Sequence, residues 1–196
     1  KDGTHRMILN LRRLNEELDY HHFKMDSLNS ALDLITRNSF MASIDLKDAY
    51  YSVPIAREYW MLLKFTFNGK HYCYTCMPNG LSPAPRIFTK LLKPVFSSLR
   101  KFGHMSTIYI DDTLLIGAGK AECEANVIAT TSLLRETGFT IHPVKSVFTP
   151  VQTIQYIGFM IDSRSMTVSL PAETMEKIRA CCRAWLQLDR PTIRQV

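Results

Sequence analysis

Three aspartates in this sequence stand where metal-assisted chemistry would need them. Asp45 ends one apolar run, and Asp111 with Asp112 stands between two others. A carboxylate beside buried strands costs free energy unless a cation or a donor compensates it, and carboxylates brought together raise one another's pKa. Mg²⁺ or Mn²⁺ resolves both problems because hard cations prefer oxygen ligands. We therefore expect a site for two such ions, about 3.5–4 Å apart, as used in phosphoryl transfer.

The apolar patterns around these acids predict the elements that carry them. Residues 40–46 read as a buried strand, and residues 106–116 read as a hairpin with the two acids at its tip. An Asp-Asp pair alone is more typical of an ordinary β-turn, so the interpretation depends on the neighbouring motifs. The Asn68-Gly69 pair predicts a second hairpin between residues 62–67 and 70–76.

Helical spacing and turn residues complete the expected architecture. We expect Ser27 to cap a helix over 27–35, and Ser82 to cap a proline-led helix that reaches residue 102 and is kinked at Pro94. Further helices are predicted over 121–137 and 172–188, and further strands over 7–11, 139–141 and 154–161. Helices on one side of a mostly antiparallel sheet make the fold class α+β.

Composition permits a nucleic-acid partner without requiring one. The 196 residues suffice for one sizeable domain or two small ones, and 46% hydrophobic with 21% charged residues is ordinary for a soluble globular protein. The formal charge of +6 fits either a nucleic-acid surface or solvated faces. No apolar run reaches the roughly 18 residues that a membrane-spanning helix needs, so we expect no membrane partner.

The cysteines indicate a reducing, intracellular location, cytoplasmic or nuclear. The chain has 5 cysteines, an odd number, and no signal-peptide pattern. Cys73 and Cys76 lie three positions apart in a strand-like run without a second pair at zinc-ligand spacing, which favours a core or hairpin role over metal binding. The first residue is Lys1 rather than Met, and the end reads like the opening of a helix. We therefore expect an excerpt of a longer polyprotein.

Six blocks, in order, resemble the motifs of reverse transcriptases. Residues 109–112, Tyr-Ile-Asp-Asp, resemble the Tyr-x-Asp-Asp signature, and residues 43–50 resemble the first catalytic motif. Residues 77–88 resemble the Pro-x-Gly-Leu…Ala-Pro…Phe motif. Residues 1–15 resemble a fingers strand, and residues 138–145 resemble the segment that brings a lysine to the nucleotide. Residues 156–159 resemble the primer grip. The blocks look most similar to retrotransposon enzymes of the gypsy-like and DIRS-like groups, and residues 22–25 and 82–90 favour DIRS-like.

The resemblance implies the fingers and palm of a polymerase, with the palm an antiparallel sheet backed by helices and the thumb missing. Residues 1–38 would belong to the fingers, residues 39–55 to the palm and residues 56–80 to a fingers hairpin. Residues 81–168 would return to the palm, and residues 169–196 would start a thumb or connection helix. The thumb and a ribonuclease H would belong to the rest of the polyprotein.

The resemblance also implies which residues hold the metal ions. Asp45 and Asp111 would bind both ions, and Asp112 would assist them. The backbone carbonyl of Leu46 would complete one ligand shell.

Other matched positions would contact the nucleotide. Arg6 would hold the α-phosphate with its planar fork, and Lys1 would reach the γ-phosphate. Tyr50 would sit under the sugar and exclude a 2′-hydroxyl, although taken alone it reads as a core aromatic. Lys145 would protonate the leaving pyrophosphate, although a solvated lysine is nearly as good an interpretation.

Three further groups of positions complete the expected site. Backbone N–H groups of Asp48, Ala49 and Tyr50 would hold triphosphate oxygens. Asn79 stands where retroviral enzymes have Gln and many retrotransposons have Phe, so its shorter amide reaches less far toward the sugar. Contacts to template and primer are expected from residues in three blocks: Gly80, Tyr109 and Gly158.

The expected function is RNA- and DNA-templated DNA synthesis from deoxynucleoside triphosphates on a primed template. One alternative is a related polymerase that makes RNA, against which Tyr50 argues. Another is a catalytically inactive, nucleic-acid-binding remnant of a retroelement. The presence of Asp45, Asp111 and Asp112 argues against such decay.

Overall fold

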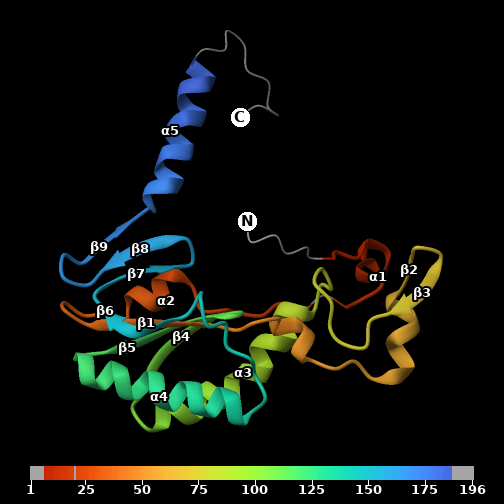
Figure 1. Cartoon of the computed structure of the whole chain (residues 1–196), viewed down its shortest axis with the longest axis horizontal. Helices are drawn as coiled ribbons and strands as arrows, with labels where there is room; N and C mark the ends of the chain where they lie inside the picture. The colour runs from red at the N-terminus through yellow and green to blue at the C-terminus, as the bar shows by residue number, and fades with distance from the viewer. Residues whose placement is uncertain (1–6, 20, 187–196) are drawn as a thin grey trace.

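An antiparallel sheet in the order β4-β5-β1-β6 forms the centre of the computed structural model (Figure 1). The structure describes residues 7–19 and 21–186. The four strands are β1 (Phe40–Asp45), β4 (Met105–Tyr109), β5 (Asp112–Gly117) and β6 (Val147–Val151). Strand β5 pairs with both β4 and β1, so the predicted hairpin and the predicted strand lie side by side.

Two long helices cover one face of this sheet (Figure 1): α3 (Ala84–Lys101) and α4 (Lys120–Glu136). Phe88, Leu92 and Phe96 recur every fourth residue of α3 and are fully buried, which places one helix stripe against the sheet. The helix continues through Pro94. The expected Ser82 cap is wrong, because Pro83 is the N-cap and no side chain caps this helix. The backbone N–H of Ser82 donates to Asn15 Oδ1 at 2.9 Å.

The opposite face is covered by the short helix α2 (Leu28–Leu32) and a three-stranded sheet. That sheet comprises β7 (Thr153–Tyr156), β8 (Phe159–Asp162) and β9 (Thr167–Ser169). Met41, Leu114 and Ile154 meet in the core between the layers. The α+β class is confirmed, with α2 on the face opposite the two long helices. The Ser27 cap is also confirmed, since its side chain accepts from the Ser30 N–H at 3.3 Å.

Two predicted strands are replaced by other structure. Residues 154–161 form a hairpin rather than one strand, because Ile157 and Gly158 adopt φ of 45° and 79° and turn the chain. Residues 139–141 contribute only an isolated bridge between Ile141 and Leu46.

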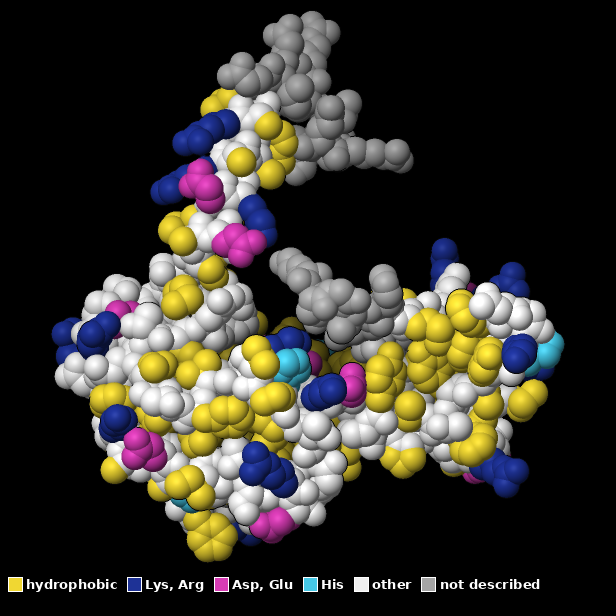
Figure 2. Space-filling view, in the orientation of Figure 1, with side chains coloured by type: hydrophobic (Ala, Val, Ile, Leu, Met, Phe, Trp, Pro, Cys, Tyr) yellow, Lys and Arg dark blue, Asp and Glu magenta, His cyan; other side chains and the backbone are white. Residues whose placement is uncertain are grey.

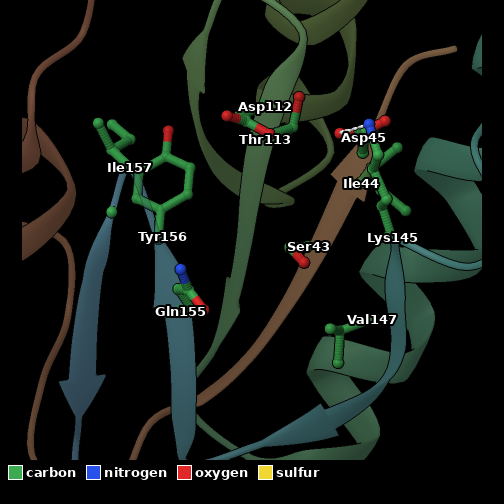
Figure 3. Close-up of a pocket in the computed structure, with 11 residues that line it drawn as sticks. Ser43, Ile44, Asp45, Asp112, Thr113, Lys145, Val147, Gln155, Tyr156 and Ile157 are labelled. Carbon is green, nitrogen blue, oxygen red and sulfur yellow. Dashed lines mark ion pairs between the residues drawn. The ribbon is translucent and has the colours of Figure 1, made fainter. Parts of the chain in front are cut away.

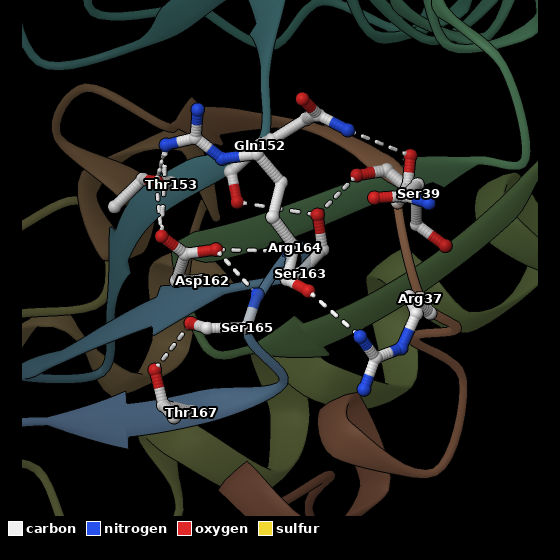
Figure 4. Close-up of polar contacts among 10 residues, drawn as sticks. Arg37, Ser39, Gln152, Thr153, Asp162, Ser163, Arg164, Ser165 and Thr167 are labelled. Carbon is white, nitrogen blue, oxygen red and sulfur yellow. Dashed lines mark hydrogen bonds and ion pairs between the residues drawn. The ribbon is translucent and has the colours of Figure 1, made fainter.

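A polar network fixes the β7–β8 hairpin to the loop that precedes β1 (Figure 4). Ser163 Oγ donates to the Ser39 carbonyl at 2.6 Å, and Gln152 Nε2 donates to the Asn38 carbonyl at 3.0 Å. Ser163 is fully buried, so these hydrogen bonds replace ones that water would otherwise make. The hairpin is thereby held beside the start of β1.

The second predicted hairpin forms at the other end of the molecule. Strands β2 (Lys64–Phe67) and β3 (Lys70–Cys73) flank Asn68 and Gly69, whose φ angles of 48° and 72° are those the turn requires. The preceding residues belong to a 3₁₀ helix, η2 (Arg57–Leu63), so the strand starts later than expected. Figure 2 shows hydrophobic side chains gathered over this hairpin. Within the hairpin, the rings of Phe65 and Tyr72 stack with their centroids 5.5 Å apart.

A helix lies near each end of the described chain. The strand expected over residues 7–11 does not form, and helix α1 (Arg12–Glu16) follows this segment. Helix α5 (Ala172–Leu186) projects from the body and buries none of its residues (Figure 1). Within residues 7–19 and 21–186, no helix is both long and apolar enough to cross a membrane.

We predict that Phe88→Ala destabilises the fold by about 3–5 kcal/mol, because the cavity left by a fully buried ring does not collapse completely. Phe88 is 0% exposed and packs edge-on against Tyr50 and Phe139, with ring centroids 5.7 and 6.0 Å away. Urea unfolding measures the effect. Ile87→Ala, on the neighbouring position at 38% exposure, is the matched control, and an equal loss in both variants would contradict the assigned core.

Candidate active site

The predicted acids from two distant chain segments meet at the end of the main sheet. Asp45 is the last residue of β1, Asp112 is the first residue of β5, and their Cα atoms are paired across the two strands. The Leu46 N–H donates to the Asp111 carbonyl oxygen at 3.1 Å, which extends the pairing into the turn. The backbones of the two acid-bearing segments therefore converge, as expected from the sequence.

The turn that carries Asp111 holds one residue in an unfavourable conformation. Ile110 has a φ of 58°, in the left-handed region that β-branched residues rarely adopt. Such a conformation costs about 1–3 kcal/mol and persists only where the surroundings enforce it. Both flanking strands, β4 and β5, must therefore be held firmly for this turn to keep its shape.

A second segment, residues 142–146, fixes Asp45 from its other side. The Asp45 N–H donates to Ser146 Oγ at 3.0 Å, and the His142 N–H donates to the Asp45 carbonyl at 2.8 Å. The Lys145 ammonium lies 3.9 Å from Asp45 Oδ2 (Figure 3). The expected lysine therefore reaches the acid cluster itself.

The acids destabilise one another's charged forms. Burial, then the charges of Asp111 and Asp45, raise the pKa of Asp112 from 3.8 to about 6. Burial also raises the pKa of Asp45, and the nearby Asp111 charge adds to this increase, while Lys145 opposes it. A cation placed among these carboxylates would relieve both effects.

A cavity of about 430 Å³ lies beside the acids, between the main sheet and the β7–β8 hairpin (Figure 3). It is lined by residues of both sheets and of the segment that carries Lys145: Ser43, Ile44, Asp45, Asp112, Thr113, Lys145, Val147, Gln155, Tyr156, Ile157 and Gly158. Asp111 is not among the lining residues. The Thr113 hydroxyl is buried and lacks a hydrogen-bond partner among the described residues.

The donor set fits a divalent metal ion in an open site. Among residues 7–19 and 21–186, no three or more His, Cys, Asp and Glu side chains are grouped closely enough to hold a metal ion by themselves. Mg²⁺ does not need such a cage, because it keeps several waters and binds through one or two carboxylates plus substrate phosphates. Asp45 and Asp112, opposite each other with raised pKa values, provide carboxylates of that kind.

We predict that Asp112→Asn raises the melting temperature of the metal-free protein at pH 8 but not at pH 4. The pKa of Asp112 rises to about 6 on folding, so the folded state favours the protonated, neutral form of this side chain. The free energy of unfolding that this provides is fully present below about pH 4 and is lost as the pH rises through 6, where Asp112 becomes charged. The neutral amide avoids that loss. Thermal unfolding in EDTA at both pH values measures it, with the exposed Asp33→Asn as control, and an equal difference at both pH values would contradict it.

The residues expected to contact the nucleotide lie next to the acids, and the structure gives them distinct settings. Asp48 has a φ of 53° and precedes a 3₁₀ helix, η1 (Ala49–Ser52). Ala49 is buried. The half-buried ring of Tyr50 packs on Phe88, and burial, then the charge of Asp111, raise the pKa of its hydroxyl to about 12. Tyr50 is therefore both a core contact and a neighbour of the acids.

Other expected site residues are spread more widely. Asn79 donates from Nδ2 to the Tyr51 hydroxyl at 2.8 Å, so part of its amide is already engaged. Gly80 has a φ of 92°, and its carbonyl accepts from Asn15 Nδ2 at 2.9 Å. Tyr109 ends β4, while Gly158 lies in the β7–β8 turn and lines the cavity. Lys1 and Arg6 lie outside the described residues.

Several residues at the site were not singled out from the sequence, although Asn15, His142 and Tyr156 lie within the matched blocks. Ser146 and His142 contact Asp45 across about a hundred positions, and Tyr156 contributes its buried ring to the cavity. Asn15 holds the loop at Gly80 and Ser82 from both sides. Long-range contacts of this kind leave no periodicity, so only the adjacent motifs could have drawn attention to these positions.

Cys73 lies in the expected hairpin, and the half-buried Cys76 lies just beyond it. Cys73 ends β3, and Cys76 forms an isolated bridge with Pro54. Both are free thiols.

Known proteins resemble this chain along most of its length. The "Enzymatic polyprotein" of soybean chlorotic mottle virus is 29% identical over 180 residues, which cover 91% of this chain and 25% of that polyprotein. The Pol polyprotein from transposon gypsy of Drosophila melanogaster is 25% identical over 175 residues, which cover 89% of this chain and 16% of that protein. The chain thus spans a quarter or less of these relatives. The expected gypsy-like relationship is confirmed, and the DIRS-like preference stays a prediction.

A solved structure shares the fold. The foamy viral protease-reverse transcriptase in complex with double-stranded DNA superimposes with a TM-score of 0.81 at 21% identity, over 99% of this chain and 32% of that one. A family model for reverse transcriptase (RNA-dependent DNA polymerase) matches residues 1–161. With the acids, the lysine and the hairpin in the places described above, the chain belongs to the reverse transcriptase family.

Proposed function

We propose that this chain is the catalytic fingers and palm of an RNA-directed DNA polymerase that copies RNA and DNA templates. The observation that carries the proposal is the pairing of Asp45 with Asp112, extended by the hydrogen bond from Leu46 to Asp111. Carboxylates held together against their own repulsion are what phosphoryl transfer with divalent cations requires.

Asp45 and Asp111 would hold two Mg²⁺ or Mn²⁺ ions, with help from Asp112 and the Leu46 carbonyl. When bound, the ions activate the primer 3′-hydroxyl and stabilise charge on the transferred phosphoryl group and the leaving oxygen. The hard oxygen ligands favour these cations over softer metals.

The chain's own residues orient the substrate. The primer 3′-hydroxyl would lose its proton to solvent, its oxygen would form a bond to the α-phosphorus of a deoxynucleoside triphosphate, and the bond from that phosphorus to the pyrophosphate oxygen would break. Lys145, whose side chain is 57% exposed and close to Asp45, would give a proton to the departing pyrophosphate. Backbone N–H groups of residues 48–50 would hold the triphosphate, and Tyr50 would lie under the sugar. Arg6, Lys1 and Asn79 complete the proposed nucleotide contacts.

The nucleic-acid partner is a primed template. The related foamy viral enzymes were solved with double-stranded DNA and with an RNA/DNA hybrid, and we extend these substrates to this chain. Gly80, Tyr109 and Gly158 would contact template and primer, and phosphate contacts would make binding weaken as salt rises. The thumb and a ribonuclease H would come from the rest of a polyprotein. The division into fingers and palm at residues 38, 55, 80 and 168 belongs to the same proposal.

Primer extension tests the proposal. The longest natural polypeptide that contains this chain is given oligo(dT) on poly(rA), and a matched DNA template, with Mg²⁺ or Mn²⁺ supplied in turn. We expect extension on both templates and none in EDTA. Tight binding of the primed template without extension under any metal would instead support the inactive nucleic-acid-binding remnant.

A further inference from the structure

The catalytic hairpin has one strand at the border of the main sheet. β4 leads into the turn with Asp111, and among residues 7–19 and 21–186 it pairs with β5 on one side only. Two backbone groups on its outer side bond to side chains instead. The Ile108 N–H donates to Asp26 Oδ2 at 3.0 Å, and the Ser106 carbonyl accepts from Arg100 Nη2 at 3.1 Å. Side chains therefore take the place of a neighbouring strand.

Asp26 is the centre of these contacts. The same oxygen, Oδ2, also accepts from the buried Thr107 hydroxyl at 3.2 Å and lies 3.9 Å from Arg100 Nη2. Asp26 immediately precedes the N-cap of α2, and Arg100 lies at the end of α3. One carboxylate thus ties elements on both faces of the sheet to the outer side of β4.

The relative strength of these contacts can be ordered. The side chains of Asp26 and Arg100 are 40% and 46% exposed, so at 3.9 Å their ion pair is screened and contributes little. The bonds from the Ile108 N–H and the Thr107 hydroxyl to a carboxylate are charge-assisted and roughly twice as strong as neutral ones. The two hydrogen bonds should therefore matter more than the ion pair to Arg100, and an amide oxygen at position 26 would still accept them, at roughly half the strength.

The contacts of Asp26 influence the positions of the catalytic acids through the turn that follows β4. Ile108 is three residues before Asp111, which is about 10 Å of extended chain, and the intervening Ile110 is held at a φ of 58°. β5 is fixed between two strands, whereas within the described part of the chain β4 has a strand on one side only. If β4 shifts, the strained turn relaxes and Asp111 moves relative to Asp45.

We propose that Asp26 is a positioning residue for catalysis, which fixes β4 so that the following turn holds Asp111 and Asp112 against Asp45. Asp26 itself touches no substrate. The inference rests on the proposed polymerase function, because positioning is measured through the rate of nucleotide addition. Misplacement by about 1 Å through a residue remote from the chemistry can cost a factor of about 100.

Single-nucleotide incorporation by rapid quench tests this in the longest natural polypeptide that contains the chain. This experiment measures the rate of incorporation per active site separately from the dissociation constants of the nucleotide and the primed template. We expect Asp26→Ala to lower the rate about 10–100-fold and to leave template–primer binding within about 2-fold. Asp26→Asn keeps an acceptor for Ile108 and Thr107 and should retain the rate within about 3-fold. Asp33→Ala, an exposed carboxylate on the same segment, is the control.

A merely structural role predicts a different pattern. It would lower the melting temperature and the fraction of active enzyme in Asp26→Ala but leave the rate per active site unchanged, and that result would overturn the proposal. Where Asp26→Ala does not fold, Asp26→Leu fills the space of the carboxylate but offers no acceptor to Ile108 and Thr107, and an unchanged rate per active site there overturns the proposal as well. Normal extension by the parent, together with loss in Asp111→Asn, keeps the polymerase function standing whichever result is found for Asp26.

Discussion

Asp111→Asn is expected to reduce primer extension at least about 1,000-fold, with Asp45→Asn equally severe. A metal-ion clamp contributes several kcal/mol of transition-state stabilisation, and each 1.36 kcal/mol is a factor of about 10 in rate. The amide is close in shape to the carboxylate but carries no charge, so the fold should persist. Asp112→Asn should be less damaging, because Asp112 is expected only to assist.

The experiment compares the parent and the variants on poly(rA) with oligo(dT), in Mg²⁺ and then in Mn²⁺. Circular dichroism checks that each variant is folded, and Asp33→Asn controls for the loss of a carboxylate elsewhere. Equal extension by the parent and Asp111→Asn would remove the assigned mechanism. Loss in all variants, including Asp33→Asn, would point to general damage instead.

Tyr50→Ala is expected to relax discrimination against ribonucleotides by about 10–100-fold, since excluding an added hydroxyl by shape alone supplies a factor of about 100. The ring is half-buried, lies edge-on to Phe88 with centroids 5.7 Å apart, and feels the charge of Asp111. Those contacts fix the ring next to the acids, where a bound sugar would lie. The readout is the ratio of incorporation efficiencies for a deoxynucleotide and its ribonucleotide.

Tyr50→Phe is the matched control, because it keeps the ring and removes only the hydroxyl. We expect it to retain the parent's ratio. An unchanged ratio in Tyr50→Ala, with activity retained, would support the reading of Tyr50 as a core aromatic and would restore the RNA-synthesising alternative. Some loss of stability in Tyr50→Ala is expected from its packing on Phe88 and does not affect the ratio.

Local sequence patterns predicted the parts of the fold that position the acids. Apolar runs that end in aspartate indicated β1 and the β4–β5 hairpin, and Asn68-Gly69 indicated the β2–β3 turn, because these signals arise from adjacent residues. Their convergence at Asp45 and Asp112 followed from the order of motifs in the resemblance rather than from periodicity.

The remaining features depend on contacts that a single sequence does not encode locally. Ser146 reaches Asp45 across 101 positions, and Asp26 reaches Ile108 across 82. The turn at Ile157 and Gly158 was hidden because isoleucine rarely adopts a φ of 45°, so an uninterrupted strand was the natural prediction. The segment 7–11 alternates only weakly, and nothing in the described structure pairs with it as a strand.

Iron-directed cleavage most directly tests whether the acids share a metal site. Fe²⁺ is allowed to replace Mg²⁺ in the longest natural polypeptide that contains this chain, and hydroxyl radicals formed at the ion cut the nearby backbone. We predict cuts in both segments 43–48 and 109–113, suppressed by excess Mg²⁺ and lost in Asp45→Asn. Cuts in one segment only, or cuts that persist in Asp45→Asn, would contradict a shared site formed by these two parts of the chain.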